Sequence, residues 1–336
     1  MRAIRWVLPG VLLAACFVDE PPTASTEQAG MNMQGMNMQG MNMQGMNMQG
    51  MNMQGFRFDG VTLAGDALSN VRVERGEVIA ERDGLTLRGA ALAGARFFAQ
   101  VRNLDVEPPV AALVEYRIVA VSSELTSYDP TRTGSTYLYT LEQRVDDEAW
   151  SPACSADGDG RRVAIPIAAT FDERGDRVES GTLFTFACTS GVIAKCYRWG
   201  YRPWLTGYGG ANMADMHWTC TRVARADYCG NGQSHTHDGT WINLWDNLPA
   251  PGPIQRHGLL PPLGMIFEAG WNTGGAVCMS RARWLLGGQT LIDIAALCPD
   301  RLVPLGLGET VCDTVGQVLG HAPDAKLFNE AYLNLL

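Results

Sequence analysis

Two histidines stand two residues apart in the segment SHTHDGTWIN, which covers residues 234–243. Alternate side chains of a strand share a face, so His235 and His237 would point to one side, where two imidazoles can bind zinc or copper. A third ligand, such as Asp227, would have to come from the folded neighbourhood. The HxHxDH pattern of metallo-β-lactamase-like hydrolases is absent, because Asp238 follows His237 directly. A metal-dependent hydrolase using His235, His237 and Asp227 is therefore one alternative, and exposed histidines in a polar loop are the other.

Methionine is concentrated in the repeat MNMQG, which occurs five times without change from Met31 to Gly55. Its thioethers, spaced as Met-x-Met, suit soft Cu(I), so Cu(I) binding by the Met repeats is a second alternative. No histidine accompanies them, and the register continues as FRFDG (56–60) and VTLAG (61–65), with Phe and Val replacing Met. Apolarity is kept while the thioether is lost, which favours packing over ligation. We therefore assign no cofactor, no metal ligand and no catalytic residue.

A period of five residues fits neither a helix nor a flat strand. On a helix it scatters the methionines over every face, and on a strand it sends successive pairs to opposite faces. A coil that turns once per pentad would bury them together, and MNMQG resembles the pentapeptide-repeat pattern of square β-helices. The pattern returns weakly at 66–70 and again at 85–94. Residues 31–105 are therefore predicted to form a short pentapeptide β-helix-like segment, with a disordered low-complexity stretch as the alternative.

Cys16 closes a short export signal. Two basic residues near the N-terminus precede an apolar run over residues 6–15 that is too short to span a bilayer. Leu13-Ala14-Ala15-Cys16 resembles a bacterial lipobox. The pattern predicts a signal peptide over 1–15, cleavage before Cys16, lipid attachment at Cys16 and a flexible tether over 16–30.

The residue after Cys16 and the net charge narrow the location and the partners. Phe17 is not the aspartate that commonly retains lipoproteins at the inner membrane, so the outer membrane or cell surface is favoured. Loss of the two arginines in the signal takes the formal charge from −9 to −11. An acidic chain without a basic run is a poor ligand for nucleic acid. The expected partners are a membrane, through the lipid anchor, and an envelope glycan or protein.

The cysteines that follow Cys16 are even in number, and an even number in an exported chain indicates disulfides. No CxxC pair occurs, which disfavours a zinc ribbon. Eight cysteines allow 105 pairings, although Cys188/Cys196 and Cys220/Cys229 are close enough in sequence for local bridges. The eight candidates are Cys154, Cys188, Cys196, Cys220, Cys229, Cys278, Cys298 and Cys312.

The elements that would position these residues are mainly strands. Alternating segments at 112–121 and 136–143 predict strands, and 162–171 with 180–188 predict a hairpin around the turn DERGD. Asn212 is expected to cap a helix with an apolar face. Asn272-Thr273-Gly274-Gly275 indicates another hairpin, and the tail over 326–336 is predicted to be a short amphipathic helix. The predicted class is α+β, strand-rich and stapled by disulfides.

Ala226-Asp227-Tyr228-Cys229 is the most specific motif. With FTFAC (184–188), AKCYRWGYRPW (194–204), SHTHDGTWIN and FEAGW (267–271), it resembles the ADYC-domain proteins, which are exported, often lipid-anchored bacterial proteins of myxobacterial type. The resemblance runs from about Val110 to Cys312 and implies an ADYC-like disulfide-rich domain over 106–315. The residues after it, 316–336, are predicted from their own pattern to be a C-terminal helical tail. It implies an extracytoplasmic compartment and no activity.

Aromatic residues suggest what such a domain would do. Seven of the nine tryptophans lie between Trp199 and Trp284. Exposed rings can stack on sugars or bind a partner protein, whereas buried rings fill a core. The leading hypothesis is a lipid-anchored, non-catalytic structural or binding module of the cell envelope.

Overall fold

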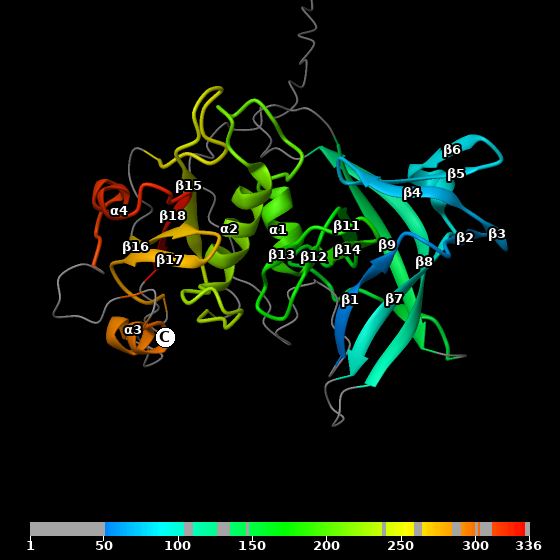
Figure 1. The fold of residues 1–336 in the computed structure, drawn as a ribbon, viewed down its shortest axis with the longest axis horizontal. Coiled ribbons are helices and arrows are strands. Elements are labelled where there is room, and N and C mark those ends of the chain that lie inside the picture. Colours follow the sequence, from blue (N-terminus) through cyan, green and yellow to red (C-terminus); the bar gives the residue numbers. More distant parts are fainter. Residues whose placement is uncertain are drawn as a thin grey trace, which may run out of the picture.

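The computed structural model describes residues 51–103, 110–125, 135–145, 148–236, 240–258, 264–283, 290–299, 302 and 311–332. Figure 1 shows strands of a large sheet on one side, two helices in the middle and a smaller sheet on the other side. The two largest hydrophobic core clusters correspond to this division, one inside the large sheet and one around the helices, and a third, smaller cluster lies at the smaller sheet. The predicted strand-rich α+β class is confirmed.

The large sheet closes on itself as a ring of six antiparallel strands. Its order is β1, β14, β11, β9, β8 and β7, and β7 also pairs with β1. These strands span Met51–Arg57 (β1), Leu183–Cys188 (β14), Ala164–Ile167 (β11), Ser135–Val145 (β9), Val110–Leu125 (β8) and Arg96–Asn103 (β7). Closure leaves no free edge on the ring strands.

Aromatic rings fill the inside of this ring. Phe56 makes edge contacts with Tyr116 and Phe186, at centroid distances of 4.7 and 4.9 Å. Phe97 and Tyr139 also contact Phe186, and all five side chains are fully buried. A small barrel is filled by its inward-facing side chains, so these rings act as its core rather than as a ligand cavity.

The last repeat and the pentads after it form antiparallel strands. Strand β1 contains the fifth MNMQG copy. It is followed by β2 (Thr62–Leu63), β3 (Asp66–Ala67), β4 (Ser69–Glu74), β5 (Glu77–Arg82), β6 (Leu85–Arg88) and a 3-10 turn, η1 (Gly89–Leu92). The pairs β2–β3, β4–β5 and β5–β6 are antiparallel, so the pentads at 56–94 do not stack as β-helical coils. Copies 31–50 lie outside the described residues.

Each of these pentads ends in a residue whose backbone φ angle is positive. The glycines that close these pentads, Gly55, Gly60, Gly65, Gly89 and Gly94, all have positive φ. Glycine adopts this conformation without the steric cost that other residues meet. The repeat therefore specifies regularly spaced changes of chain direction, and the partner strands decide how the segments between them pair.

The hairpins and long strands predicted from the sequence are confirmed. Strands β8 and β9 pair along most of their length. β11 pairs with β14, and between them β12 (Thr170–Phe171) and β13 (Arg177–Val178) flank the DERGD turn. Strands β16 (Met265–Asn272) and β17 (Gly275–Met279) form the hairpin around the NTGG turn. A short strand, β10 (Ser151–Pro152), pairs antiparallel with β9.

Two helices lie between the sheets (Figure 1). Helix α1 spans Val192–Arg198 and α2 spans Met213–Arg225. The predicted cap of α2 is confirmed, because the Asn212 side chain accepts hydrogen bonds from the backbone N–H groups of Ala214 and Asp215. The N-terminal end of a helix exposes backbone N–H groups that have no partner within the helix, and the Asn212 cap provides an acceptor for two of them.

The smaller sheet has the order β15, β18, β16, β17. Strands β15 (Ile242–Asp246) and β18 (Leu327–Tyr332) join β16 and β17, with α3 (Leu291–Leu297) and α4 (Val315–His321) nearby. The prediction of a helix over 326–336 is wrong at 327–332, which forms β18. Pairing with β15 on one side and β16 on the other overrides the helical periodicity of this segment.

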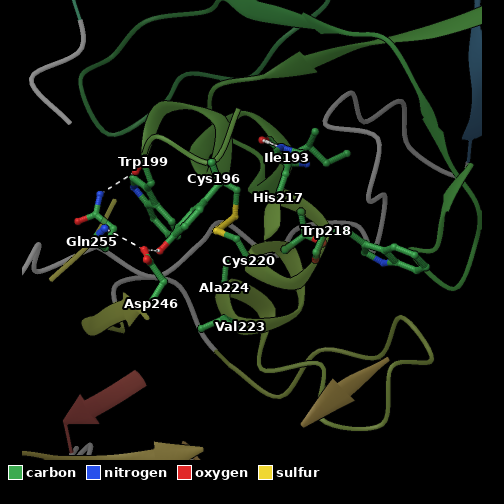
Figure 2. Close-up of a disulfide and its surroundings, with 12 residues drawn as sticks. Ile193, Cys196, Trp199, His217, Trp218, Cys220, Val223, Ala224, Asp246 and Gln255 are labelled. Carbon is green, nitrogen blue, oxygen red and sulfur yellow. Dashed lines mark hydrogen bonds between the residues drawn. A yellow bond between two sulfur atoms is a disulfide. The ribbon is translucent and has the colours of Figure 1, made fainter. Parts of the chain in front are cut away.

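All eight cysteines after Cys16 form disulfides, as predicted. The pairs are Cys154–Cys188, Cys196–Cys220, Cys229–Cys298 and Cys278–Cys312. Neither of the two local pairings formed, because Cys188 ends a barrel strand and Cys196 lies on α1, which face different partners. Figure 2 shows the bridge that joins α1 to α2. Disulfides are typical of proteins that fold outside the cytoplasm.

Among the described helices, none combines the length and the apolarity that crossing a membrane requires.

Candidate functional site

The Ala226-Asp227-Tyr228-Cys229 motif begins where α2 ends. Ala226 is the C-cap and has left-handed dihedral angles, with φ 50° and ψ 44°. Its N–H bonds the carbonyls of Arg222 and Val223, and the next N–H, of Asp227, bonds Arg222 at 3.0 Å. Carbonyls left over at the end of the helix are thereby satisfied while the chain reverses direction.

Asp227 is a buried carboxylate whose oxygens are both in use. One oxygen accepts from the N–H of Asn231 at 3.1 Å, and the other from Gly232 at 3.0 Å and from Arg222 Nη1 at 2.5 Å. Arg222 is equally buried and also pairs with Asp176. Buried charges are retained only when they are paired and hydrogen-bonded. Asp227 therefore fixes the turn after α2, and this engagement gives no support to a metal-ligand role.

Tyr228 connects the motif to the smaller sheet. Its hydroxyl donates to Glu268 Oε1 at 3.0 Å and accepts the backbone N–H of Arg283 at 2.6 Å. Its ring stacks on Trp271, with centroids 5.2 Å apart. Burial and the nearby Glu268 carboxylate raise the pKa of Tyr228 well above its ordinary value, so the hydroxyl stays protonated and can donate.

Glu268 is the centre of this network, and a β-bulge places it there. Phe267 faces Glu330 and Ala269 faces Asn329, which leaves Glu268 as the extra residue of β16. Such a bulge redirects a side chain, and here it turns the carboxylate into the interior. Asn329 donates to Glu268 Oε2 at 2.9 Å.

Arg283 completes the network as the cation. Its Nε and Nη2 both donate to the Glu268 carboxylate at 2.9 Å, which is the bidentate geometry that a guanidinium favours. The same guanidinium donates to the carbonyls of Val223 and Ala224 near the end of α2, where the helix dipole favours positive charge. The pair thus ties α2 to β16.

Cys229 and Gly230 hold the motif against the rest of the domain. Cys229 is joined to Cys298, just after α3. Gly230 has φ 66°, and a Cβ built on it would lie 1.8 Å from the carbonyl oxygen of Gly274. The turn at 272–275 can approach the motif this closely only because residue 230 is glycine.

The histidine cluster predicted from the sequence lies only partly within the described residues. His235 is buried and its ring lies 5.6 Å from that of Tyr228. Its backbone N–H bonds the carbonyl of Arg225, at the end of α2. His237 and Asp238 lie outside the described residues, as do the side chains of the Met repeats. In the part of the chain that the structure describes, no three His, Cys, Asp or Glu residues gather as a metal site would require.

Most of the tryptophans that the sequence singled out serve the cores. Trp199, Trp245 and Trp271 are buried, and Trp271 donates to Asn329 at 2.7 Å. Trp241 is the exposed member of the described group, at 40%. The tryptophan-rich segment therefore indicates packing around α1, α2 and the smaller sheet more than one continuous aromatic surface.

Sequence reasoning found the motif but missed its partners Glu268, Arg283 and Asn329. Glu268 lies inside FEAGW, and Arg283 follows the second hairpin strand. Two arginines close together in an otherwise apolar stretch were the available signal for a buried pair. The bulge that turns Glu268 inward leaves no mark in the sequence.

His217 is a second buried polar group on α2. Figure 2 shows it directed toward Ile193, whose carbonyl lies 2.9 Å from its Nε2. Burial, together with a smaller effect of the positive charge of Arg177, lowers the pKa of His217 to about 4. The folded protein therefore holds this imidazole neutral at pH values where an exposed histidine is charged.

This depressed pKa predicts a loss of stability in mild acid. The contribution of His217 is fully present above the unfolded pKa of about 6.5 and is lost as the pH falls toward 4, because only the unfolded chain binds the proton. We expect about 3 kcal/mol of the free energy of unfolding to disappear across this window. Urea unfolding at pH 7, 5.5 and 4.5 measures it, and His217→Gln should flatten that part of the dependence. His321→Gln, at an exposed position, is the control, and equal slopes for His217→Gln and the wild type would contradict the prediction.

Comparison with known proteins identifies one match. The family model described as ADYC domain matches residues 89–285, which is more than half of the chain. The match contains α1, α2, the four-residue motif and both members of the Glu268–Arg283 pair. No curated protein and no solved structure matches the chain.

Proposed function

The chain belongs to the ADYC domain family, and from this premise we propose that it is a non-catalytic binding module held at the cell envelope by a lipid on Cys16. In this proposal the signal over 1–15 is removed, residues 16–30 form the tether, and the repeats lead into the domain. The outer membrane or the cell surface is the proposed location, because Phe17 follows Cys16 in place of the aspartate that commonly retains lipoproteins at the inner membrane. An envelope glycan or protein is the expected partner.

One observation supports the non-catalytic part of the proposal. The side chains of the family motif are engaged in contacts that hold the fold together. Asp227 is held by Arg222 and two backbone N–H groups, Tyr228 by Glu268 and Arg283, and Cys229 by Cys298. A catalytic acid, base or nucleophile has to reach a substrate atom. These side chains are turned toward one another inside the protein, so the motif supports a scaffold that presents other surfaces.

The disulfides support the location. Bridges persist in oxidising compartments and are rare in the cytoplasm. Four of them join segments up to 69 residues apart, which suits a domain that works in the open environment outside the cell membrane.

The proposed lipid anchor predicts that the protein is found in the membrane fraction and that it leaves this fraction when Cys16 is replaced. In a bacterial host with two membranes, the wild-type protein should incorporate labelled palmitate and sediment with membranes, whereas Cys16→Ser should do neither. The substitution removes the thiol that carries the lipid, and a single acyl chain already contributes about 0.8 kcal/mol of membrane binding per buried CH₂ group.

A control separates loss of the anchor from loss of the fold. Thiol titration of unfolded, unreduced Cys16→Ser should find essentially no free cysteine, because the eight domain cysteines are paired. A Cys16→Ser protein that remains labelled and membrane-bound would disprove the anchor. Turnover of an ester or phosphoester substrate that is lost in His235→Ala would disprove the non-catalytic role.

A further inference from the structure

Arg281 is a buried guanidinium to which no carboxylate is bound among the residues that the structure describes. It follows β17 and is 7% exposed. Its Nη2 donates to the carbonyl of Ile266 at 3.2 Å and to that of Ala331. These two residues face each other in the β16–β18 register, so two strands hold the side chain at one nitrogen. Nε and Nη1 are buried and have no hydrogen-bond partner among the residues that the structure describes.

The charges around Arg281 do not balance. The carboxylate that acts on it is Glu268, but the oxygens of Glu268 are bound by Arg283, Tyr228 and Asn329. Within the described part of the chain, two buried guanidiniums thus share one carboxylate. Burial lowers the pKa of Arg281 from its ordinary value, because removal from water destabilises the cation. An unpaired charge in the interior is costly, and a bound anion would offset that cost.

A second cluster of buried charges near the motif, around Arg225, can be compared with the surroundings of Arg281. Arg225 is also buried, and its side chain donates to the carbonyl of Gly232. It belongs, however, to a group with two carboxylates, because Asp227 acts on it and Arg222 bonds both Asp227 and Asp176, while the exposed Arg174 also pairs with Asp176. Arg225 therefore has two carboxylates in its group, whereas among the described residues Arg281 has Glu268 as the carboxylate that acts on it.

We propose that Arg281 forms the base of a binding site for an oxyanion, the carboxylate or phosphate group of an envelope ligand, at the end of the smaller sheet. A guanidinium presents several N–H donors in one plane, which match the oxygens of such groups. Arg281 is 7% exposed, and Ile266, whose carbonyl it binds, has a side chain that is 44% exposed, so one of the residues that hold the guanidinium lies at the protein surface. The inference rests on the proposed binding role for its ligand class, and it does not depend on the anchor at Cys16.

The test begins with the full mature chain carrying Cys16→Ser, purified with its disulfides. Sodium phosphate and sodium acetate are titrated against sodium chloride at equal ionic strength, and the melting temperature is recorded. A ligand that binds only the folded state stabilises it by mass action. We expect a saturable rise of roughly 4 °C at a hundredfold excess over the dissociation constant for at least one oxyanion, and none for chloride.

Vesicles distinguish a free anion from a lipid headgroup. Phosphatidylglycerol vesicles, compared with phosphatidylcholine vesicles, should bind the same Cys16→Ser protein if the oxyanion belongs to a lipid. A response to phosphate or acetate without vesicle binding assigns the site to a soluble ligand. The wild-type chain should keep its lipid label whatever the result, so failure of this site is separate from failure of the anchor.

Variants assign any response to Arg281. Arg281→Gln should abolish the shift and any vesicle binding, Arg281→Lys should weaken them because it keeps the charge without the planar donors, and Arg225→Gln should retain them. Circular dichroism and thiol titration show which variants fold. If the shift survives in folded Arg281→Gln, or if the Cys16→Ser protein itself responds to neither phosphate, acetate nor phosphatidylglycerol, the proposal is wrong.

Discussion

Replacing Arg283 by methionine is expected to lower the free energy of unfolding by about 3–5 kcal/mol, because it leaves a buried carboxylate without its cation. In the native protein both oxygens of Glu268 face the Arg283 guanidinium, and neither residue is exposed by more than 1%. Urea unfolding followed by tryptophan fluorescence measures the loss, with Trp271 stacked on Tyr228 as an internal reporter. Near-UV circular dichroism should lose intensity at a correspondingly lower urea concentration.

A double-mutant cycle separates the pair from its surroundings. Glu268→Met alone should destabilise by a similar amount, while Glu268→Met with Arg283→Met should lose less than the two single changes added together. Removing both charges removes the cost of burying either of them. Arg256→Met, at an exposed position, is the control for the loss of an arginine. Strictly additive effects would show that the two side chains are not coupled.

Removing the Cys229–Cys298 bridge should cost about 4 kcal/mol of stability. This bridge closes a separation of 69 residues, and the chain-entropy model assigns greater stabilisation to longer loops. The paired change Cys229→Ser with Cys298→Ser avoids a free thiol. It should also release α3, whose C-terminal end the bridge holds next to the motif. Chemical unfolding measures the first effect, and limited proteolysis within residues 291–297 measures the second.

The bridge between α1 and α2 is the matched control. Cys196→Ser with Cys220→Ser opens a separation of 24 residues, for which the same model gives about 3.4 kcal/mol. That variant should be destabilised almost as much, yet α3 should stay protected from protease at low urea. Early cleavage of α3 in both variants would mean that the Cys229–Cys298 bridge has no local role.

Local signals in the sequence predicted the elements that depend on local interactions. The cap at Asn212 and the DERGD and NTGG turns each work within a few residues, and each lies where the sequence placed it. The four disulfides followed from cysteine number and compartment. Their pairing did not, because it depends on how α1, α2 and the barrel strands meet.

The C-terminal segment shows why longer-range features could not be predicted. Leu327 and Phe328 are buried, but so are Asn329 and Glu330, which a sequence reader assigns to a solvated face. Their partners are far away in the chain, with Trp271 and Glu268 bound to Asn329, and Asn243 and His257 bound to Glu330. A central strand whose buried polar side chains are hydrogen-bonded can have the same sequence pattern as an amphipathic helix.

In the candidate site, too, the local motif could be predicted, whereas the long-range contacts of its residues could not. The family motif could be recognised from four consecutive residues, and Cys229 could be predicted to form a disulfide. What Asp227 and Tyr228 do could not be inferred, since their partners come from α2, from the bulge in β16 and from the loop after β17. The imbalance at Arg281 becomes visible only when these contacts are counted together.

The ring of six strands has a consequence for the order of events during export. Strand β1 is synthesised before the other described strands, yet one of its neighbours, β14, lies more than 120 residues later in the chain. Contacts between segments so distant form slowly, because a long loop must close before they contribute. One side of β1 can pair early with β7, whereas the side that faces β14 is completed late. Until β14 arrives, both the exposed side of β1 and the open side of the growing sheet can pair with other chains, so translocation and folding have to be closely timed.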